Sequence, residues 1–181
     1  HHVREALENA ESGPVEEGSV GGGTGMLCYE VKGGSGTSSR KLPEKLGGWT
    51  VGAFAQTNFG RRFQLTIAGV PVGRHLRDNS IWTSGENPFK QDDGSLIIII
   101  ATDAPLLPHQ LKRLAKRASL GMARTGSLGG NGSGDIFLAF STANPNTARG
   151  DEKGLASLQG LSNNFIDPLL MASAYATEEA I

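Results

Sequence analysis

The dipeptide Gly94-Ser95 joins a polar, proline-containing stretch, residues 87–93, to the apolar run at residues 96–100. Short runs rich in β-branched residues are typical of strands buried on both faces, so we expect a strand that holds Ser95 rigidly at its start. Cleavage before Ser95 would give it a nucleophilic hydroxyl and a free α-amine that can act as the base. Taken alone, the dipeptide favours an ordinary turn that enters a core strand, and only the surrounding sequence favours a cleavage site.

A second polar group lies in the glycine-rich loop 129–135, which carries Ser133 and Asp135 just before another strand-like segment. Ser133 can bond the nucleophile while Asp135 orients Ser133 or the new α-ammonium, which is the arrangement of a base and its orienting partner. The alternative is an Asx turn, in which these side chains bond only to nearby backbone groups.

Asn58 follows the strand-like stretch 53–57. An amide at a strand end can donate to a developing oxyanion, an interaction of roughly 3–4 kcal/mol in other hydrolases. Its alternative role is that of a turn residue that ends the strand. These residue types therefore suggest acyl transfer and leave the structural alternatives open.

Other chemistries have weaker signals. The glycine clusters at 21–25 and 33–36 lack the Gly-Lys-Ser/Thr ending of a phosphate-binding loop. The four histidines show no metal-ligand spacing, and Cys28 has no nearby partner. We therefore expect neither a metal nor another cofactor.

Composition narrows the class of protein. The 181 residues suit one domain, and a net charge of −1 with 19% charged residues argues against nucleic acid or an anionic membrane as partner. The single cysteine rules out an internal disulfide and suits a reducing compartment. Without a membrane-spanning stretch or a signal peptide, a cytoplasmic location is expected.

Periodicity and turn residues predict an α+β layered protein rather than a parallel doubly wound one. Asp167 is expected as an N-cap, while Pro108 suits a first helical turn and Gly121 a helix end. Both ends of the chain look cut from a longer sequence. Expected strands are residues 26–31, 49–56, 65–72, 98–102 and 135–141, and expected helices are residues 3–10, 108–121 and 167–181.

Several motifs occur in a fixed order along nearly the whole chain. They are GSVGGGTGM at 18–26, KGGSGTSSR at 32–40, QLTIAGVPVG at 64–73, DGS at 93–95 leading to ATDAPL at 101–106, and NGSGD at 131–135 leading to AFSTAN at 139–144. Together they resemble the L-aminopeptidase D-amidase/D-esterase family, which includes the β-peptidyl aminopeptidases.

The resemblance implies a precursor that cleaves itself between Gly94 and Ser95. It also implies a four-layer α-β-β-α sandwich, similar to the N-terminal nucleophile hydrolases but connected differently, of which this chain is a partial copy. Residues 1–181 would then be part of a single catalytic domain, with 1–94 the end of an α subunit and 95–181 in the β subunit.

The same resemblance assigns roles to the candidate residues. Ser95 matches the family's nucleophile, Ser133 and Asp135 match its partners, and Asn58 matches its oxyanion donor. Some family members have Glu where this chain has Asp135, a departure that bears on the proton relay.

The implied function is a serine aminopeptidase or amidase that acts through an acyl-enzyme on short peptides, amino-acid amides or esters. It needs no cofactor and works as a homo-oligomer of processed αβ units. The alternatives are an acyltransferase like ornithine acetyltransferase, which normally uses Thr as nucleophile, and a non-catalytic fragment that retains the fold.

Overall fold

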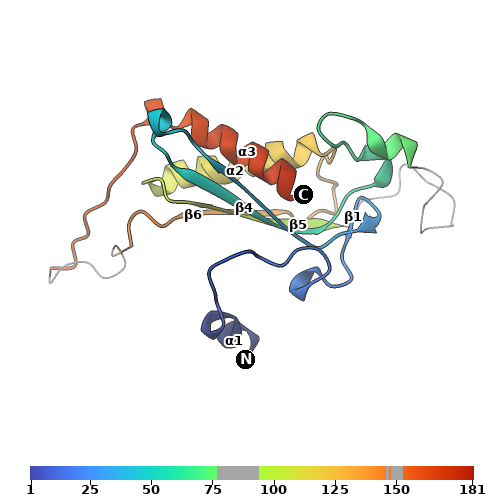
Figure 1. Cartoon of the computed structure of the whole chain (residues 1–181), viewed down its shortest axis with the longest axis horizontal. Coiled ribbons are helices and arrows are strands. Elements are labelled where there is room, and N and C mark those ends of the chain that lie inside the picture. The colour runs from blue at the N-terminus through green and yellow to red at the C-terminus, as the bar shows by residue number, and fades with distance from the viewer. Residues whose placement is uncertain (77–93, 146, 148–152) are drawn as a thin grey trace.

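A computed structural model describes residues 1–76, 94–145, 147 and 153–181, so the polar stretch before Gly94, residues 87–93, lies outside the described residues. Short 3₁₀ turns connect several of the regular elements. The helices and strands are α1 (His2–Glu8), β1 (Leu27–Cys28), β2 (Val31–Lys32), β3 (Ser35–Lys41), β4 (Thr50–Asn58), β5 (Ser95–Thr102), α2 (Pro108–Arg124), β6 (Ile136–Ser141) and α3 (Asp167–Ala180) (Figure 1).

The main sheet has the strand order β3-β4-β5-β6. The β3–β4 and β4–β5 pairs are antiparallel, whereas β5 and β6 run parallel and are joined through α2. A parallel pair requires such a crossover because its strands begin at the same edge of the sheet. The α+β class is confirmed, and the sheet includes one βαβ unit.

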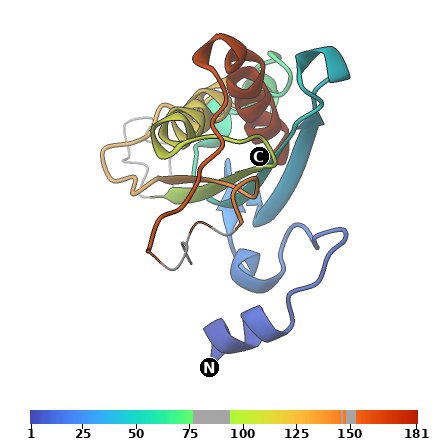
Figure 2. The same cartoon turned by 90° about the vertical axis from the view of Figure 1, so that its left-hand side faces the viewer.

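Helices α2 and α3 cover one face of this sheet (Figure 2), and the core lies between them and the strands. Along β5, Leu96, Ile98 and Ile100 are buried while Ile97 is 43% exposed. Within the described chain this run is therefore buried on its helix face only, because the described layers cover only that side. The uncovered face of β6 is also apolar and exposes Ile136, Leu138 and Phe140.

The segment expected as one strand, residues 26–31, instead forms a hairpin of two short strands, β1 and β2, with two residues each. Its turn residues Tyr29 and Glu30 have φ values of 52° and 59°, in the left-handed region that a continuous strand does not enter. Strand β3 was not expected, because its serines and glycine read as a loop. It forms seven residue pairs with β4, which shows that a neighbouring strand outweighs local propensity.

The expected strand 65–72 is also wrong. This segment holds only the bridge between Ile67 and Val70, followed by a 3₁₀ turn from Val72 to His75. Ala68 and Gly69 have φ values of 49° and 82°, and proline at 71 lacks the N–H that a strand ladder needs.

The terminal helices differ from expectation by short shifts. Asp167 is the first residue of α3, and Ile166 holds the N-cap position. The α1 helix is present near the expected place but has no buried residue. Within the described chain, no helix is both long enough and apolar enough to cross a lipid bilayer.

Gly121 lies inside α2, which continues to Arg124, and so does not end the helix as expected. A Cβ atom at this position would lie 2.4 Å from the carbonyl oxygen of Ala174 and 2.6 Å from Cβ of Thr177. The glycine therefore allows α2 and α3 to pack at close range over the sheet.

This contact predicts that Gly121→Ala destabilises the full-length protein. Alanine gains about 1 kcal/mol in helix propensity, but overpacking costs about 1–3 kcal/mol or more, and here the clash includes backbone that cannot rotate away. Thermal unfolding should show a lower Tm. Lys116→Ala, at an exposed position of the same helix, is the control and should leave Tm nearly unchanged. A Tm at or above that of the wild type for Gly121→Ala would contradict the close packing.

Candidate active site

Ser95 and Asn58 lie at the shared end of β5 and β4, where they are direct partners in the antiparallel register. Such partners have Cβ atoms about 4.5–5.5 Å apart on the same face of the sheet. The neighbouring side chains Leu96 and Thr57 are buried on the helix side. Ser95 and Asn58 therefore lie together on the face that the helices leave uncovered.

The glycine-rich loop reaches Ser95 through backbone as well as side chains. The N–H of Gly134 donates a hydrogen bond of 2.9 Å to Oγ of Ser95. Parallel pairing of Ile97 with Ile136 brings the start of β6, and with it the loop, to the start of β5. Sequence reasoning missed Gly134 because its contribution is a backbone donor, although the position of the loop before a strand was a usable signal.

Asp135 connects the loop to the backbone beside Ser95. Its Oδ1 accepts hydrogen bonds from the N–H of Leu96 at 3.1 Å and from the hydroxyl of Ser133 at 2.7 Å. The Ser133 hydroxyl has one proton and donates it to Asp135, so it does not donate a hydrogen bond to Ser95. The donor to Oγ of Ser95 is the N–H of Gly134. The loop thus holds a carboxylate one residue from the nitrogen of Ser95.

The side-chain amide of Asn58 is anchored through its oxygen. Oδ1 accepts a hydrogen bond of 3.2 Å from the N–H of Leu27, in β1. The other end of the amide, Nδ2, carries two protons and therefore points its donors away from this contact. Asn58 is exposed, so these donors are available on the face that it shares with Ser95.

Gly94 and Ser95 are joined in the described chain, and both are half-buried. The hydroxyl oxygen of Ser95 is three bonds from its own backbone nitrogen, which forms the peptide bond with Gly94. The arrangement thus combines a positioned hydroxyl, an adjacent peptide carbonyl, amide donors and a carboxylate. These are the groups that acyl transfer to a serine requires.

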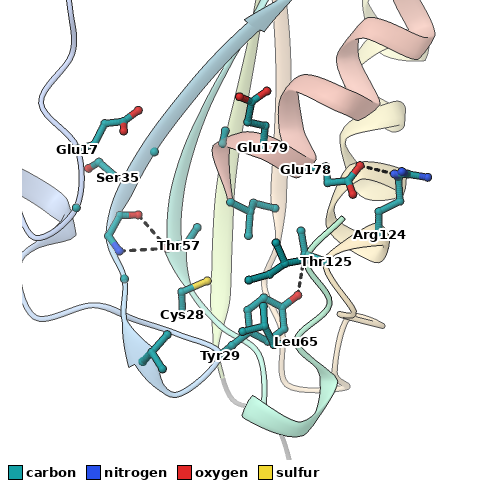
Figure 3. Close-up of a pocket in the computed structure, with 18 of the residues that line it drawn as sticks. Glu17, Cys28, Tyr29, Ser35, Thr57, Leu65, Arg124, Thr125, Glu178 and Glu179 are labelled. Carbon is teal, nitrogen blue, oxygen red and sulfur yellow. Dashed lines mark hydrogen bonds and ion pairs between the residues drawn. The ribbon is translucent and has the colours of Figure 1, made fainter. Parts of the chain in front are cut away.

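A cavity of about 1210 Å³ lies elsewhere, between the β1–β2 hairpin, β3 and the C-terminal ends of α2 and α3 (Figure 3). Its lining includes Cys28 and Thr57 but none of Ser95, Asn58, Ser133 and Asp135. Burial raises the pKa of the Cys28 thiol to about 11, despite an opposing hydrogen bond with Thr57. Near neutral pH this cysteine stays a thiol and is no rival nucleophile.

One grouping departs from the expectation that the histidines form no ligand set. Potential ligand atoms of His1, His2 and Glu5 lie within 4.8 Å of one another at the start of α1. All three residues are exposed, and exposed groupings of this kind are common without a bound ion. It therefore identifies no metal site.

The model of peptidase family S58 matches residues 1–181. Among curated proteins, a β-peptidyl aminopeptidase, BapA of Sphingosinicella microcystinivorans, is 47% identical over 188 residues, covering 99% of this chain and 47% of the relative.

Solved structures give the same result. A Burkholderia sp. β-aminopeptidase is 49% identical with a TM-score of 0.84, covering 99% of this chain and 49% of that chain. The L-aminopeptidase D-Ala-esterase/amidase of Ochrobactrum anthropi is 47% identical with a TM-score of 0.84, covering 99% and 47%. That structure is described as a prototype for the serine aminopeptidases and a new variant of the Ntn hydrolase fold.

The chain spans about half the length of these relatives. Identity near one half and superposition over 99% of the chain confirm both the resemblance carried by the sequence motifs and the layered α+β fold. The chain belongs to peptidase family S58.

Proposed function

We propose that the whole protein is a self-processing serine aminopeptidase or amidase that removes N-terminal residues from short peptides, amino-acid amides or esters. The observation that carries this proposal is the setting of Ser95. Its hydroxyl oxygen is held by the N–H of Gly134 at 2.9 Å, next to the carbonyl of Gly94 and opposite Asn58. The names of the relatives support the substrate class.

Processing would begin when Oγ of Ser95 attacks the carbonyl carbon of Gly94. The new C–O bond forms as the C–N bond breaks, and the hydroxyl proton passes to the nitrogen of Ser95. Water then hydrolyses the ester, giving a carboxylate on Gly94 and restoring the serine hydroxyl. Residues 1–94 and 95–181 would become parts of the α and β subunits of one catalytic domain.

In turnover, Oγ of Ser95 would attack the carbonyl of the substrate's N-terminal residue. The serine's own α-amine, with a reference pKa of about 8, can take the proton near neutral pH and return it to the leaving group. Donors on Nδ2 of Asn58 and on the backbone would hold the oxyanion. Water then releases the acyl group.

Asp135 and Ser133 would support the new N-terminus. The Asp135 carboxylate bonds the N–H of Leu96, the residue next to Ser95. A negative charge beside the α-amine favours the protonated form of the amine and so makes it a stronger base. Ser133 would hold that carboxylate through its own hydrogen bond.

The rest of the proposal concerns partners and location. We propose a homo-oligomer of processed αβ units in the cytoplasm, with short peptides or aminoacyl amides and esters as partners and no nucleic acid. A peptidase match over residues 1–181 supports the hydrolase over the acyltransferase alternative, as does serine rather than threonine at position 95.

Ser95→Ala in the full-length protein should leave an uncut chain that still folds. The attacking hydroxyl is lost, whereas Leu96, Ile98 and Ile100 keep their burial, worth roughly 1.5–3 kcal/mol each. Ser95→Thr and Ser95→Cys keep a nucleophile and should cut slowly. Denaturing gels with N-terminal sequencing measure the result. If Ser95→Ala still produced a subunit that begins at residue 95, Ser95 would not be the nucleophile.

Asn58→Ala should lower kcat by about 10²–10³ with a smaller change in KM, because an oxyanion donor binds the transition state better than the substrate. Asn58→Asp is the matched variant, since it keeps an acceptor for Leu27 but loses the donors. It should lose activity as well. Steady-state kinetics on the processed enzyme measure kcat and KM for both variants. A change in KM alone would give Asn58 a role in substrate binding instead.

Asp135→Asn should lower kcat by about 10² or more, in the range typical of acid–base partners, while the fold is retained. The amide oxygen can still accept the bonds from Leu96 and Ser133, so the variant removes mainly the charge. The acid limb of kcat/KM should move to lower pH, because the α-ammonium loses a stabilising charge.

The matched control is Asp103→Asn, at the other end of the sheet. Asp103 also accepts a backbone hydrogen bond across strands, from the N–H of Thr50 at 2.7 Å. Its kcat and pH profile should match those of the wild type. Equal effects of the two substitutions would remove the special role given to Asp135.

A further inference from the structure

Tyr29 occupies an unusual position in the β1–β2 hairpin. It is 1% exposed and has a φ of 52°, which a bulky residue adopts only where its surroundings impose it. Its hydroxyl lies 2.6 Å from Oγ1 of Thr125, the C-cap of α2 (Figure 3). Because the Thr125 hydroxyl donates its proton to the carbonyl of Met122, Tyr29 is the donor in this pair.

A series of backbone hydrogen bonds connects Tyr29 to Asn58. The N–H of Tyr29 donates to the carbonyl of Phe59 at 2.8 Å, and the N–H of Phe59 donates to the carbonyl of Leu27 at 3.0 Å. The N–H of Leu27 in turn donates to Oδ1 of Asn58. Residues 27–29 thus lie beside residues 58–60, and their position sets the direction of the Asn58 amide.

The chain makes room for the Tyr29 ring. Gly60 has a φ of 87°, and a Cβ atom there would lie 2.7 Å from the ring. The ring also meets that of Phe59 edge-on, with centroids 5.2 Å apart. Since β1 and β2 have two residues each, the hairpin is too short to be stable by itself and depends on such anchors.

We propose that Tyr29, through its hydrogen bond to Thr125, is a positioning residue that holds the Asn58 amide opposite Ser95. This inference rests on the proposed role of Asn58 as oxyanion donor. Donors stabilise an oxyanion in proportion to how well they are fixed before the reaction. A hairpin released from Thr125 would leave Asn58 in place on β4 but with a less defined amide direction, so kcat falls and KM does not.

The loss is expected to be partial, because the hairpin has a second anchor. The guanidinium of Arg62 donates to the carbonyl of Glu30, and Nε of Arg61 lies 3.2 Å from a carboxylate oxygen of Glu30. We therefore expect Tyr29→Phe to lower kcat about tenfold, less than the roughly 10²-fold that a misplacement of about 1 Å can cost.

The kinetic test is a double-mutant cycle in the full-length, processed enzyme, with an aminoacyl amide as substrate. Tyr29→Phe should lower kcat in the wild-type background and cause no further loss in the Asn58→Ala background. Thr125→Val should lower kcat as Tyr29→Phe does. Thr125→Ser keeps the hydroxyl and should have a kcat close to that of the wild type. Ser173→Ala is the control, since it removes a buried hydroxyl bonded to the carbonyl of Leu114. It should lower Tm without lowering kcat.

A second measurement does not depend on catalysis. In the uncut Ser95→Ala protein, Tyr29→Phe should speed amide hydrogen exchange at residues 27–29, whereas Ser173→Ala should not. Unchanged exchange would overturn the proposal, as would equal kcat losses of Tyr29→Phe in the two backgrounds. If exchange changes but Asn58→Ala retains full kcat, the proposed role of Asn58 fails and the positioning role fails with it.

Discussion

The candidate site depends on the pairing of β5 with β4 on one side and with β6 on the other. Antiparallel register places Asn58 opposite Ser95, and parallel register brings the loop before β6 to the same end of β5. A shift of one residue in either pair would turn the polar side chains to the helix face. The register is specified because Leu96, Ile98 and Ile100 must be buried under the helices.

The same constraint explains which face of the sheet carries the chemistry. Alternation along β5 directs Leu96 to the helices and Ser95 to the uncovered face, beside the exposed Ile97. A sheet with one face under helices and an apolar second face is what a four-layer sandwich needs, because a second sheet packs there. Ser95 would then lie at the edge of the space between two sheets, where surrounding apolar groups exclude water and strengthen electrostatic contacts.

Backbone groups do much of the positioning. Gly134 holds the hydroxyl of Ser95, Leu96 holds Asp135, and Leu27 holds the Asn58 amide. Strand ends and short hairpins provide these donors because their ladders stop there and leave N–H groups without a neighbouring strand. The large cavity beside Cys28 lies on the helix side of β4 and is separated by that strand from Ser95.

The sequence by itself determined the elements with strong periodicity, namely β4, β5, β6 and the two long helices, as well as the residue types able to carry out acyl transfer. It did so because alternation, helical spacing and ordered motifs are local properties of the chain. Only the tertiary structure decided that Ser35–Lys41 is a strand, that residues 65–72 are not, and that Gly121 is a helix contact. It also decided that Gly134 and Leu27 are the donors around Ser95 and Asn58. Those features arise from partners distant in the chain, and a backbone N–H is the same in every residue except proline, so no side-chain pattern can reveal them.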